Sequence, residues 1–276
     1  MAMRRVALCG ATLFSLLSGC SGLSVFPTPI QSAQSFAVYH GFAERIYQSD
    51  KFRITSFVRK SGGSPVLKVY IEGDGAPWRA NLIPPSDPTP RRSTVLEMAA
   101  QDRGQAVMYL ARPCQYLDVH ALQDCSVDYW TAKRFSAEVI DTLDNAITQA
   151  MRECGAKELQ LVGYSGGGTI ALYLTERRDD VTQLTTIASP LNHVLWTEYH
   201  DIAPLTGSLA PVIAGRQRQG IRQTHVAGEK DAVVPPQLMR EMLPKNAALK
   251  VMPGFDHECC WAADWGRILV ELGLAN

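Results

Sequence analysis

A serine flanked by glycines stands in the segment of this chain best suited to chemistry. Residues 163–167 read Gly-Tyr-Ser-Gly-Gly. They follow a short apolar run at 159–162, typical of a buried strand, and precede a stretch with helical spacing that opens at Gly168. A sharp strand-to-helix turn leaves no room for side chains beside the serine and exposes its hydroxyl. The pattern predicts Ser165 as a nucleophile; the alternative is a glycine-rich turn with an incidental serine.

A nucleophilic serine needs a base to accept its proton and an acid to orient that base. Among six histidines, His257 comes just after the last apolar run of the chain. Asp231 lies in the loop that follows the preceding apolar run, at 224–226, with Glu229 and Asp256 as the nearest alternative acids. A serine, an acid and a histidine at three separate loop ends predict a catalytic triad.

The elements that must position these residues alternate between short apolar runs and helical stretches. The pattern predicts strands at 52–59, 66–71, 106–110, 159–162, 184–187, 224–226 and 249–251, the first as an antiparallel edge strand. It predicts helices at 94–101, 136–152, 168–176, 236–242 and 262–272. We therefore expect one α/β domain with a mostly parallel central sheet and helices on both faces.

From about residue 50 to 276, the chain resembles the α/β-hydrolase superfamily in motif order and spacing. The segment 228–235, Gly-Glu-Lys-Asp-Ala-Val-Val-Pro, is similar to the acid-bearing loop of that family. The resemblance identifies Asp231 as the acid and His257, placed after the last strand, as the general base. It implies the α/β-hydrolase fold and an acyl-transfer mechanism in which Ser165 is the nucleophile, with no metal and no organic cofactor.

The resemblance also implies an oxyanion hole made of two backbone N–H groups. Gly166, next to the nucleophile, supplies the first. The loop 72–75, Glu-Gly-Asp-Gly, resembles the His-Gly oxyanion loop of the family, with Glu72 in place of the histidine, and offers the N–H of Asp74 as the second. A carboxylate beside an oxyanion is unfavourable, so we expect the Asp74 side chain either to point away or to be paired, with Arg79 or Arg112 as the candidate partners. The alternative is a tight turn that uses two glycines.

The first twenty residues resemble a bacterial lipoprotein signal. Two arginines precede a mostly apolar run at 6–17, too short to span a bilayer. Leu-Ser-Gly-Cys at 17–20 is similar to a lipobox, which implies cleavage before Cys20 and acylation of that cysteine. We expect a signal peptide at 1–19, a lipidated tether at 20–35 and the hydrolase domain at 36–276. Ser21 favours the outer membrane of the bacterial envelope, facing the periplasm; the alternative is an ordinary signal peptide.

Seven cysteines become five once Cys9 is removed and Cys20 is lipidated, so at least one thiol is left over. Cys114 and Cys125, eleven residues apart, are the natural disulfide pair in an oxidising compartment. The adjacent cysteines at 259 and 260 could pair with each other, or one of them with Cys154.

Composition limits the partners. The chain has 27 basic and 27 acidic residues, so no basic field exists to hold a nucleic acid. We expect a small or amphipathic acyl substrate and a membrane contact through the lipid on Cys20. The leading interpretation is a hydrolase of carboxylic esters or related acyl bonds; the alternatives are a non-catalytic envelope lipoprotein that binds through the same fold, and a peptidase or amidase.

Overall fold

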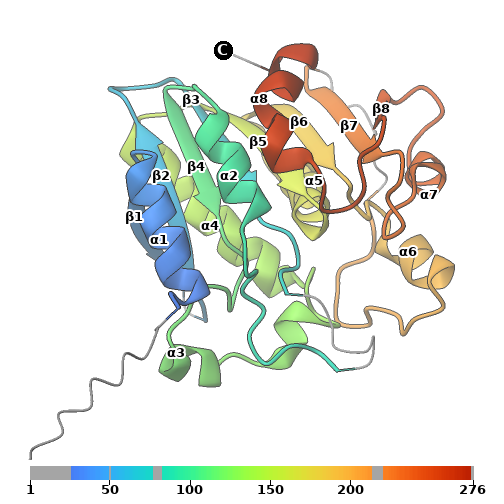
Figure 1. Cartoon of the computed structure of the whole chain (residues 1–276), viewed down its shortest axis with the longest axis horizontal. Helices are drawn as coiled ribbons and strands as arrows, with labels where there is room; N and C mark the ends of the chain where they lie inside the picture. The colour runs from blue at the N-terminus through green and yellow to red at the C-terminus, as the bar shows by residue number, and fades with distance from the viewer. Residues whose placement is uncertain (1–25, 50, 77–82, 213–219, 275–276) are drawn as a thin grey trace, which may run out of the picture.

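Figure 1 shows a computed structural model of the chain, which describes residues 26–49, 51–76, 83–212 and 220–274. Within these residues eight strands form one sheet, in the order β1-β2-β4-β3-β5-β6-β7-β8. The strands are β1 (Ala43–Gln48), β2 (Arg53–Lys60), β3 (Val66–Ile71), β4 (Ala106–Leu110), β5 (Glu158–Tyr164), β6 (Val181–Ile187), β7 (Arg222–Gly228) and β8 (Leu249–Met252).

The sheet is parallel from β4 to β8, whereas β2 runs antiparallel to both β1 and β4. All seven predicted strands are present, and the mostly parallel sheet is confirmed. The edge position predicted for residues 52–59 is wrong, because β1 pairs outside β2. The sequence gives no alternating signal for β1, since Tyr47 is its one buried residue.

Helices cover both faces of the sheet, as predicted. The described helices are α1 (Pro29–Tyr39), α2 (Thr94–Gln101), α3 (Val119–Gln123), α4 (Ala137–Cys154), α5 (Gly166–Arg177), α6 (His193–Tyr199), α7 (Pro236–Glu241), α8 (Trp261–Glu271) and the 3-10 turn η1 (Val127–Trp130). Apolar residues of α4, α5 and α7 pack in one core cluster, and those of α1, α2 and α8 pack in the other. In Figure 1, α1, α2 and α8 lie in front of the sheet.

The folded part begins earlier than predicted, because α1 occupies the second half of the expected tether. Thr28 caps this helix: its hydroxyl accepts from the Gln31 N–H, and the Gln31 side chain accepts from the Thr28 N–H. Ala33 and Ala37 are buried against the core. The boundary at residue 36 is therefore replaced by one at Pro29 or before. The expected signal peptide and Cys20 lie outside the described residues.

The structure pairs Cys114 with Cys125, as predicted, and Cys259 with Cys260. Cys154 is buried in α4 and carries a free thiol. The vicinal pair comes two residues after His257 and immediately precedes α8. Both disulfides thus lie in loops at the carboxyl end of the parallel strands, where the predicted triad lies.

His225 is a packed core histidine in β7, and its burial predicts how the stability of the fold depends on pH. The side chain is fully buried, with Nδ1 2.8 Å from the Thr186 hydroxyl. Burial, aided by the charge of Arg240, lowers the pKa of His225 to about 4, against 6.5 for an ordinary histidine. Between these values the unfolded chain binds a proton that the folded chain does not, so stability is lost as pH falls.

We expect the free energy of unfolding to drop by about 2 to 3 kcal/mol from this residue alone between pH 7 and pH 4.5. Urea unfolding at both pH values, for the natural chain and for His225→Gln, measures the contribution. The glutamine does not titrate, so the variant should lose less stability over the same interval. Equal losses in both proteins would contradict the assignment.

Candidate active site

Ser165 lies at the sharp turn between β5 and α5. Its φ of 50° falls in the left-handed region, which is rare for a residue with a side chain and is found at functional turns. The turn is held by a hydrogen bond from the Ser165 N–H to the Ile187 carbonyl of β6, at 2.8 Å. A Cβ on Gly167 would come within 2.2 Å of the Ile71 carbonyl oxygen, so only glycine permits this approach to β3.

The structure brings Ser165, His257 and Asp231 into one hydrogen-bonded line. His257 Nε2 lies 3.1 Å from Ser165 Oγ, and His257 Nδ1 lies 2.9 Å from Asp231 Oδ2. The Asp231 side chain is fully buried, and its Oδ1 accepts from the N–H groups of Val233 and Val234, both at 2.8 Å. An acceptor at Nδ1 places the imidazole proton there and leaves Nε2 free to take the serine proton.

The alternative acids do not contact the histidine. Glu229 accepts from the Gly254 N–H at 2.8 Å, and Asp256 accepts from the Glu258 N–H at 2.9 Å. Both carboxylates therefore stabilise turns in the loops around the site. Asp231 is the carboxylate that contacts His257.

Tyr164, which the sequence analysis did not single out, holds the histidine loop. Its hydroxyl donates to the His257 carbonyl at 2.5 Å, and Trp261 Nε1 donates to the same oxygen at 3.1 Å. Tyr164 immediately precedes the nucleophile, so one strand end anchors both Ser165 and the loop of its base. The signal that could have found it is its place directly before Ser165, as the one large side chain in the segment 163–167.

The predicted oxyanion loop, residues 72–75 after β3, lies directly against Ser165. A Cβ on Gly73 would stand 3.3 Å from Ser165 Cβ, and one on Gly166 would stand 2.0 Å from Asp74 Oδ1. The backbone N–H groups of Asp74 and Gly166 donate to no described residue. Two donors from different elements are therefore available beside the serine, the arrangement that an oxyanion requires.

The Asp74 carboxylate is paired with two buried arginines. Arg112 Nη1 lies 3.1 Å from Oδ1 and Arg134 Nη1 lies 2.7 Å from Oδ2. Burial alone would raise the pKa of Asp74, but the two guanidinium groups hold it below its ordinary value. The expected pairing with Arg112 is present; Arg79 lies outside the described residues. Arg134, sixty residues away in sequence, gave no local signal.

Glu72 holds the start of the loop 72–75 in place through its buried carboxylate. It is buried and accepts from the Gly73 N–H at 2.9 Å, from the Tyr109 hydroxyl at 2.9 Å and from the Ser93 hydroxyl. Burial raises the pKa of Glu72, although these donors counteract part of the effect. The residue that departs from the family pattern thus orients the loop through its own neighbour.

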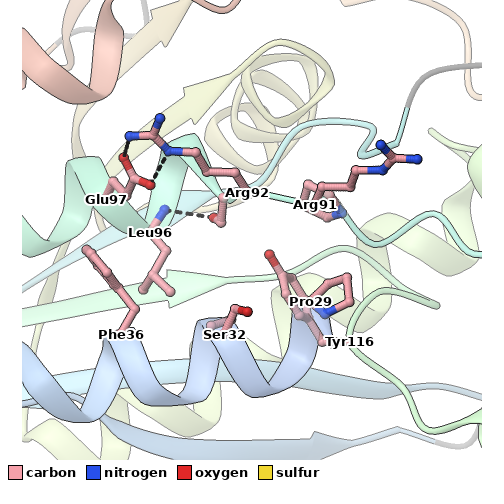
Figure 2. A pocket seen from close by; sticks show the side chains of 11 residues that line it. Pro29, Ser32, Phe36, Arg91, Arg92, Leu96, Glu97 and Tyr116 are labelled. Atoms are coloured by element: carbon pink, nitrogen blue, oxygen red, sulfur yellow. Dashed lines mark hydrogen bonds and ion pairs between the residues drawn. The ribbon is translucent and has the colours of Figure 1, made fainter. Parts of the chain in front are cut away.

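Cavities elsewhere in the described chain do not reach the triad. One of about 140 Å³ lies between α1 and α2, lined by Phe36, Leu96 and Tyr116 among others (Figure 2). Another of about 180 Å³ lies beside the Cys114–Cys125 disulfide. Neither is lined by a triad residue. The described residues contain no cluster of three or more metal-binding side chains.

Solved structures resemble this chain over most of its length. An alpha-beta serine hydrolase homologue from Coxiella burnetii is 15% identical, with TM-score 0.53, covering 84% of this chain and 95% of that one. Est1E from Butyrivibrio proteoclasticus is 13% identical, with TM-score 0.53, covering 84% and 97%. A membrane phospholipase A, a bacterial virulence factor, is 18% identical, with TM-score 0.53, covering 90% and 93%.

The chain has the α/β-hydrolase fold. Its eight-stranded, mostly parallel sheet and the helices on both faces of that sheet agree with this fold. At these identities the likeness establishes the α/β-hydrolase architecture, and the chemistry has to be argued from the site.

A sequence-family model gives a different match. The C-terminal domain of phosphoglucomutase/phosphomannomutase matches residues 31–83, less than a fifth of the chain. In the α/β-hydrolase fold seen here, the match begins within α1 and runs through β3 and the loop 72–75. Strands β2 and β3 pair with β4 and β5, which lie outside the match. The matched segment is therefore no separate domain. No curated protein matches the sequence.

Proposed function

We propose that the protein is a serine hydrolase that cleaves a carboxylic ester or a related acyl bond through an acyl-enzyme intermediate. The observation that carries the proposal is the hydrogen-bonded line from Ser165 through His257 to Asp231, at 3.1 and 2.9 Å. A fold needs no such line for its stability. Each member comes from a different loop at the carboxyl end of the sheet, where α/β proteins place their ligands.

The geometry supports the following steps. Ser165 Oγ attacks the acyl carbonyl while His257 Nε2 takes the hydroxyl proton, and Asp231 stabilises the resulting imidazolium. The carbonyl oxygen becomes an oxyanion that accepts from the N–H groups of Gly166 and Asp74. His257 then returns the proton to the leaving oxygen as the first product departs. A water, deprotonated by His257, hydrolyses the acyl-serine by the same route.

The charges around the hole suit this chemistry. Asp74 would oppose an oxyanion on the adjacent N–H groups if its charge were unbalanced. Arg112 and Arg134 both bind the Asp74 carboxylate, so two guanidinium groups balance its charge. Both arginines are buried, which limits screening by solvent.

The proposal includes anchoring in a bacterial envelope through a lipid on Cys20, facing the periplasm. It rests on the lipobox-like residues 17–20 and on the two disulfides, which favour an oxidising compartment. No helix of the described residues is both long and apolar enough to cross a bilayer. A lipid-anchored hydrolase meets amphipathic acyl substrates at the membrane surface, and the resemblance to a membrane phospholipase A is consistent with this class.

A fluorophosphonate probe tests the hydrolase proposal directly. An activated serine displaces fluoride from phosphorus and becomes covalently labelled, whereas an ordinary serine does not react. We expect label on the peptide that contains Ser165, and no label in Ser165→Ala or His257→Ala. The folded state of each variant is checked by circular dichroism.

The result also separates the alternative functions. A folded natural chain that takes no label would contradict the hydrolase proposal and favour a binding lipoprotein. For a labelled protein, p-nitrophenyl esters compared with p-nitroanilides of the same acyl group distinguish an esterase from an amidase. We expect hydrolysis of the ester to dominate.

A further inference from the structure

The loop that follows β4 packs against the oxyanion loop and brings one buried amide to it. Gln115 lies between Cys114 and Tyr116 and is 1% exposed. Its Nε2 donates to the Gly73 carbonyl at 3.1 Å, and its Oε1 accepts from the Arg112 N–H at 3.0 Å. A buried amide with both ends bonded to backbone has one orientation, so it can fix the position of what it bonds.

The bond to Gly73 bears on the oxyanion hole through the geometry of the peptide unit. The Gly73 carbonyl and the Asp74 N–H belong to the same trans peptide, so they point in opposite directions. Holding the carbonyl toward Gln115 therefore directs the Asp74 N–H away from Gln115. That N–H is the predicted second donor to the oxyanion.

This peptide needs an external restraint. Glu72 holds the Gly73 N–H, which fixes the preceding peptide but not the one that follows. Gly73 has no side chain, so rotation of its following peptide meets little steric resistance. A flipped peptide would turn the Asp74 N–H out of the hole and bring a carbonyl oxygen toward the oxyanion. Gln115 donates the hydrogen bond that opposes this flip.

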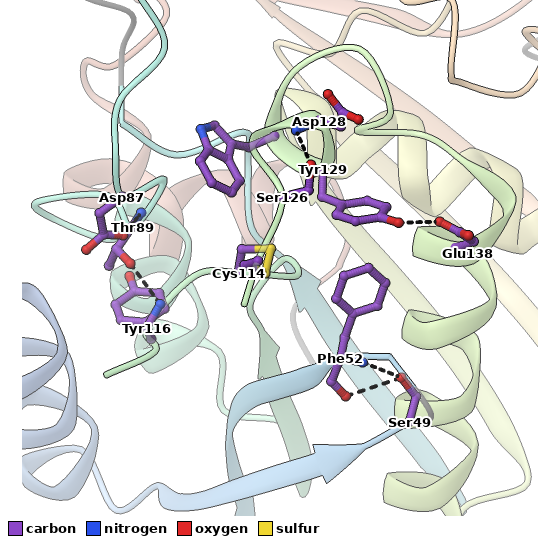
Figure 3. The surroundings of a disulfide bond; sticks show 12 residues. Ser49, Phe52, Asp87, Thr89, Cys114, Tyr116, Ser126, Asp128, Tyr129 and Glu138 are labelled. Carbon is purple, nitrogen blue, oxygen red and sulfur yellow. Dashed lines mark hydrogen bonds between the residues drawn. A yellow bond between two sulfur atoms is a disulfide. The ribbon is translucent and has the colours of Figure 1, made fainter. Parts of the chain in front are cut away.

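The loop that carries Gln115 is itself held on both sides. Cys114 and Tyr116 have φ values of 71° and 55°, an unusual pair of left-handed residues that bends the backbone on either side of Gln115. Cys114 is bonded to Cys125, and the Tyr116 N–H donates to Thr89 Oγ1 at 2.8 Å (Figure 3). The Tyr116 carbonyl accepts from Thr55 Oγ1 at 3.2 Å.

Gly75 shows how closely the two loops approach. A Cβ there would stand 2.7 Å from Gln115 Nε2 and 1.8 Å from the Pro88 carbonyl oxygen. Its φ of 90° also excludes other residue types. The backbone of the oxyanion loop thus lies directly on the Gln115 amide.

We propose that Gln115 is a positioning residue of the oxyanion hole: it holds the Gly73–Asp74 peptide so that the Asp74 N–H stands ready for the oxyanion. The inference rests on the proposed hydrolase function. It assigns a role in activity to the disulfide-closed loop after β4, whose Cys114 adjoins Gln115. It also explains how an oxyanion loop with glutamate in place of histidine keeps a fixed donor.

The test is Gln115→Met, which keeps the length of the side chain and removes its hydrogen bonds. With a p-nitrophenyl ester, we expect kcat to fall by about tenfold to a hundredfold while KM changes less than threefold. The reason is that the Asp74 N–H, no longer held in place, donates to an oxyanion that forms only on the way to the transition state. A trifluoromethyl ketone, whose adduct with Ser165 carries an oxyanion, should bind more weakly by a similar factor. Gln115→Glu keeps the acceptor for the Arg112 N–H and should show the same pattern.

The matched control is Gln101→Met in α2. Gln101 also has both ends bonded to backbone, at Ala262 and Gly266, away from the triad. Its loss should lower the thermal midpoint without changing kcat. The inference is overturned if both Gln115 variants keep the kcat and ketone affinity of the natural chain, or if Gln101→Met shows the same kinetic loss. A natural chain that takes no fluorophosphonate would instead overturn the hydrolase function itself.

Discussion

Ser165→Ala and His257→Ala are each expected to lower kcat by about 10⁶-fold, and the double variant is expected to lose no more than either. The reason is that the two side chains act as one unit: the hydroxyl is a poor nucleophile without the imidazole, and the imidazole has no proton to accept without the hydroxyl. Release of p-nitrophenol from an ester, followed at equal enzyme concentration and over longer times for the slow variants, measures the rates of the two single variants and of the double variant.

The matched control for the serine is Ser189→Ala. Ser189 follows β6 at the same edge of the sheet, and its hydroxyl donates to the Ile187 carbonyl at 2.9 Å. This variant should keep kcat within a few fold, even if its stability changes. Losses that multiply in the double variant would mean that Ser165 and His257 contribute independently, and the hydrogen bond of 3.1 Å between them would then have no catalytic role.

Most of the fold could be predicted because the buried strands carry a strong local signal. Strand β4 has five buried residues of five, β3 has five of six and β6 has six of seven. Such runs can pack only inside a sheet covered on both faces. Strand β1 was missed because it is exposed along nearly its whole length. Its place is set by pairing with β2, which is a tertiary property.

The prediction of a tether at residues 29–35 was wrong for a different reason. Its many small and polar residues suggested a tether, yet they form the first turns of α1. The local information was present in Thr28, Pro29 and Gln31, which form a capping box with proline at the first position. The interpretation gave more weight to composition than to this capping box, although the capping box sets where the helix begins.

The three residues of the hydrogen-bonded line could be named from sequence because each follows a recognisable strand and stands in a short motif. The supporting residues could not. Arg134 contacts Asp74 and Gln115 contacts Gly73 from loops sixty and forty-two positions away. No spacing rule connects such pairs, since their distance depends on how the loop after β4 is folded across the sheet edge. Gln115 is the harder of the two to find, because its partner is a backbone carbonyl, which every residue has.

Asp231→Asn is expected to lower kcat by about 10⁴-fold while the fold is retained. The two N–H groups of Val233 and Val234 need an oxygen, so the asparagine carbonyl takes the place of Oδ1. The amide NH₂ then faces His257 and donates to Nδ1. The imidazole is driven to carry its proton on Nε2, which faces Ser165 and can no longer accept the hydroxyl proton.

Two neighbouring carboxylates provide the controls that separate this effect from a change in local charge. Glu229→Gln and Asp256→Asn remove the same charge from the same pair of loops, but neither carboxylate contacts His257. Both variants should keep kcat within a few fold, with Asp231→Asn alone losing the activity. If all three variants lost comparable activity, the cause would be the loss of negative charge from these loops and not the tautomer of His257. The tautomer itself is measurable, because ¹⁵N chemical shifts of His257 should exchange their assignment between Nδ1 and Nε2 in Asp231→Asn.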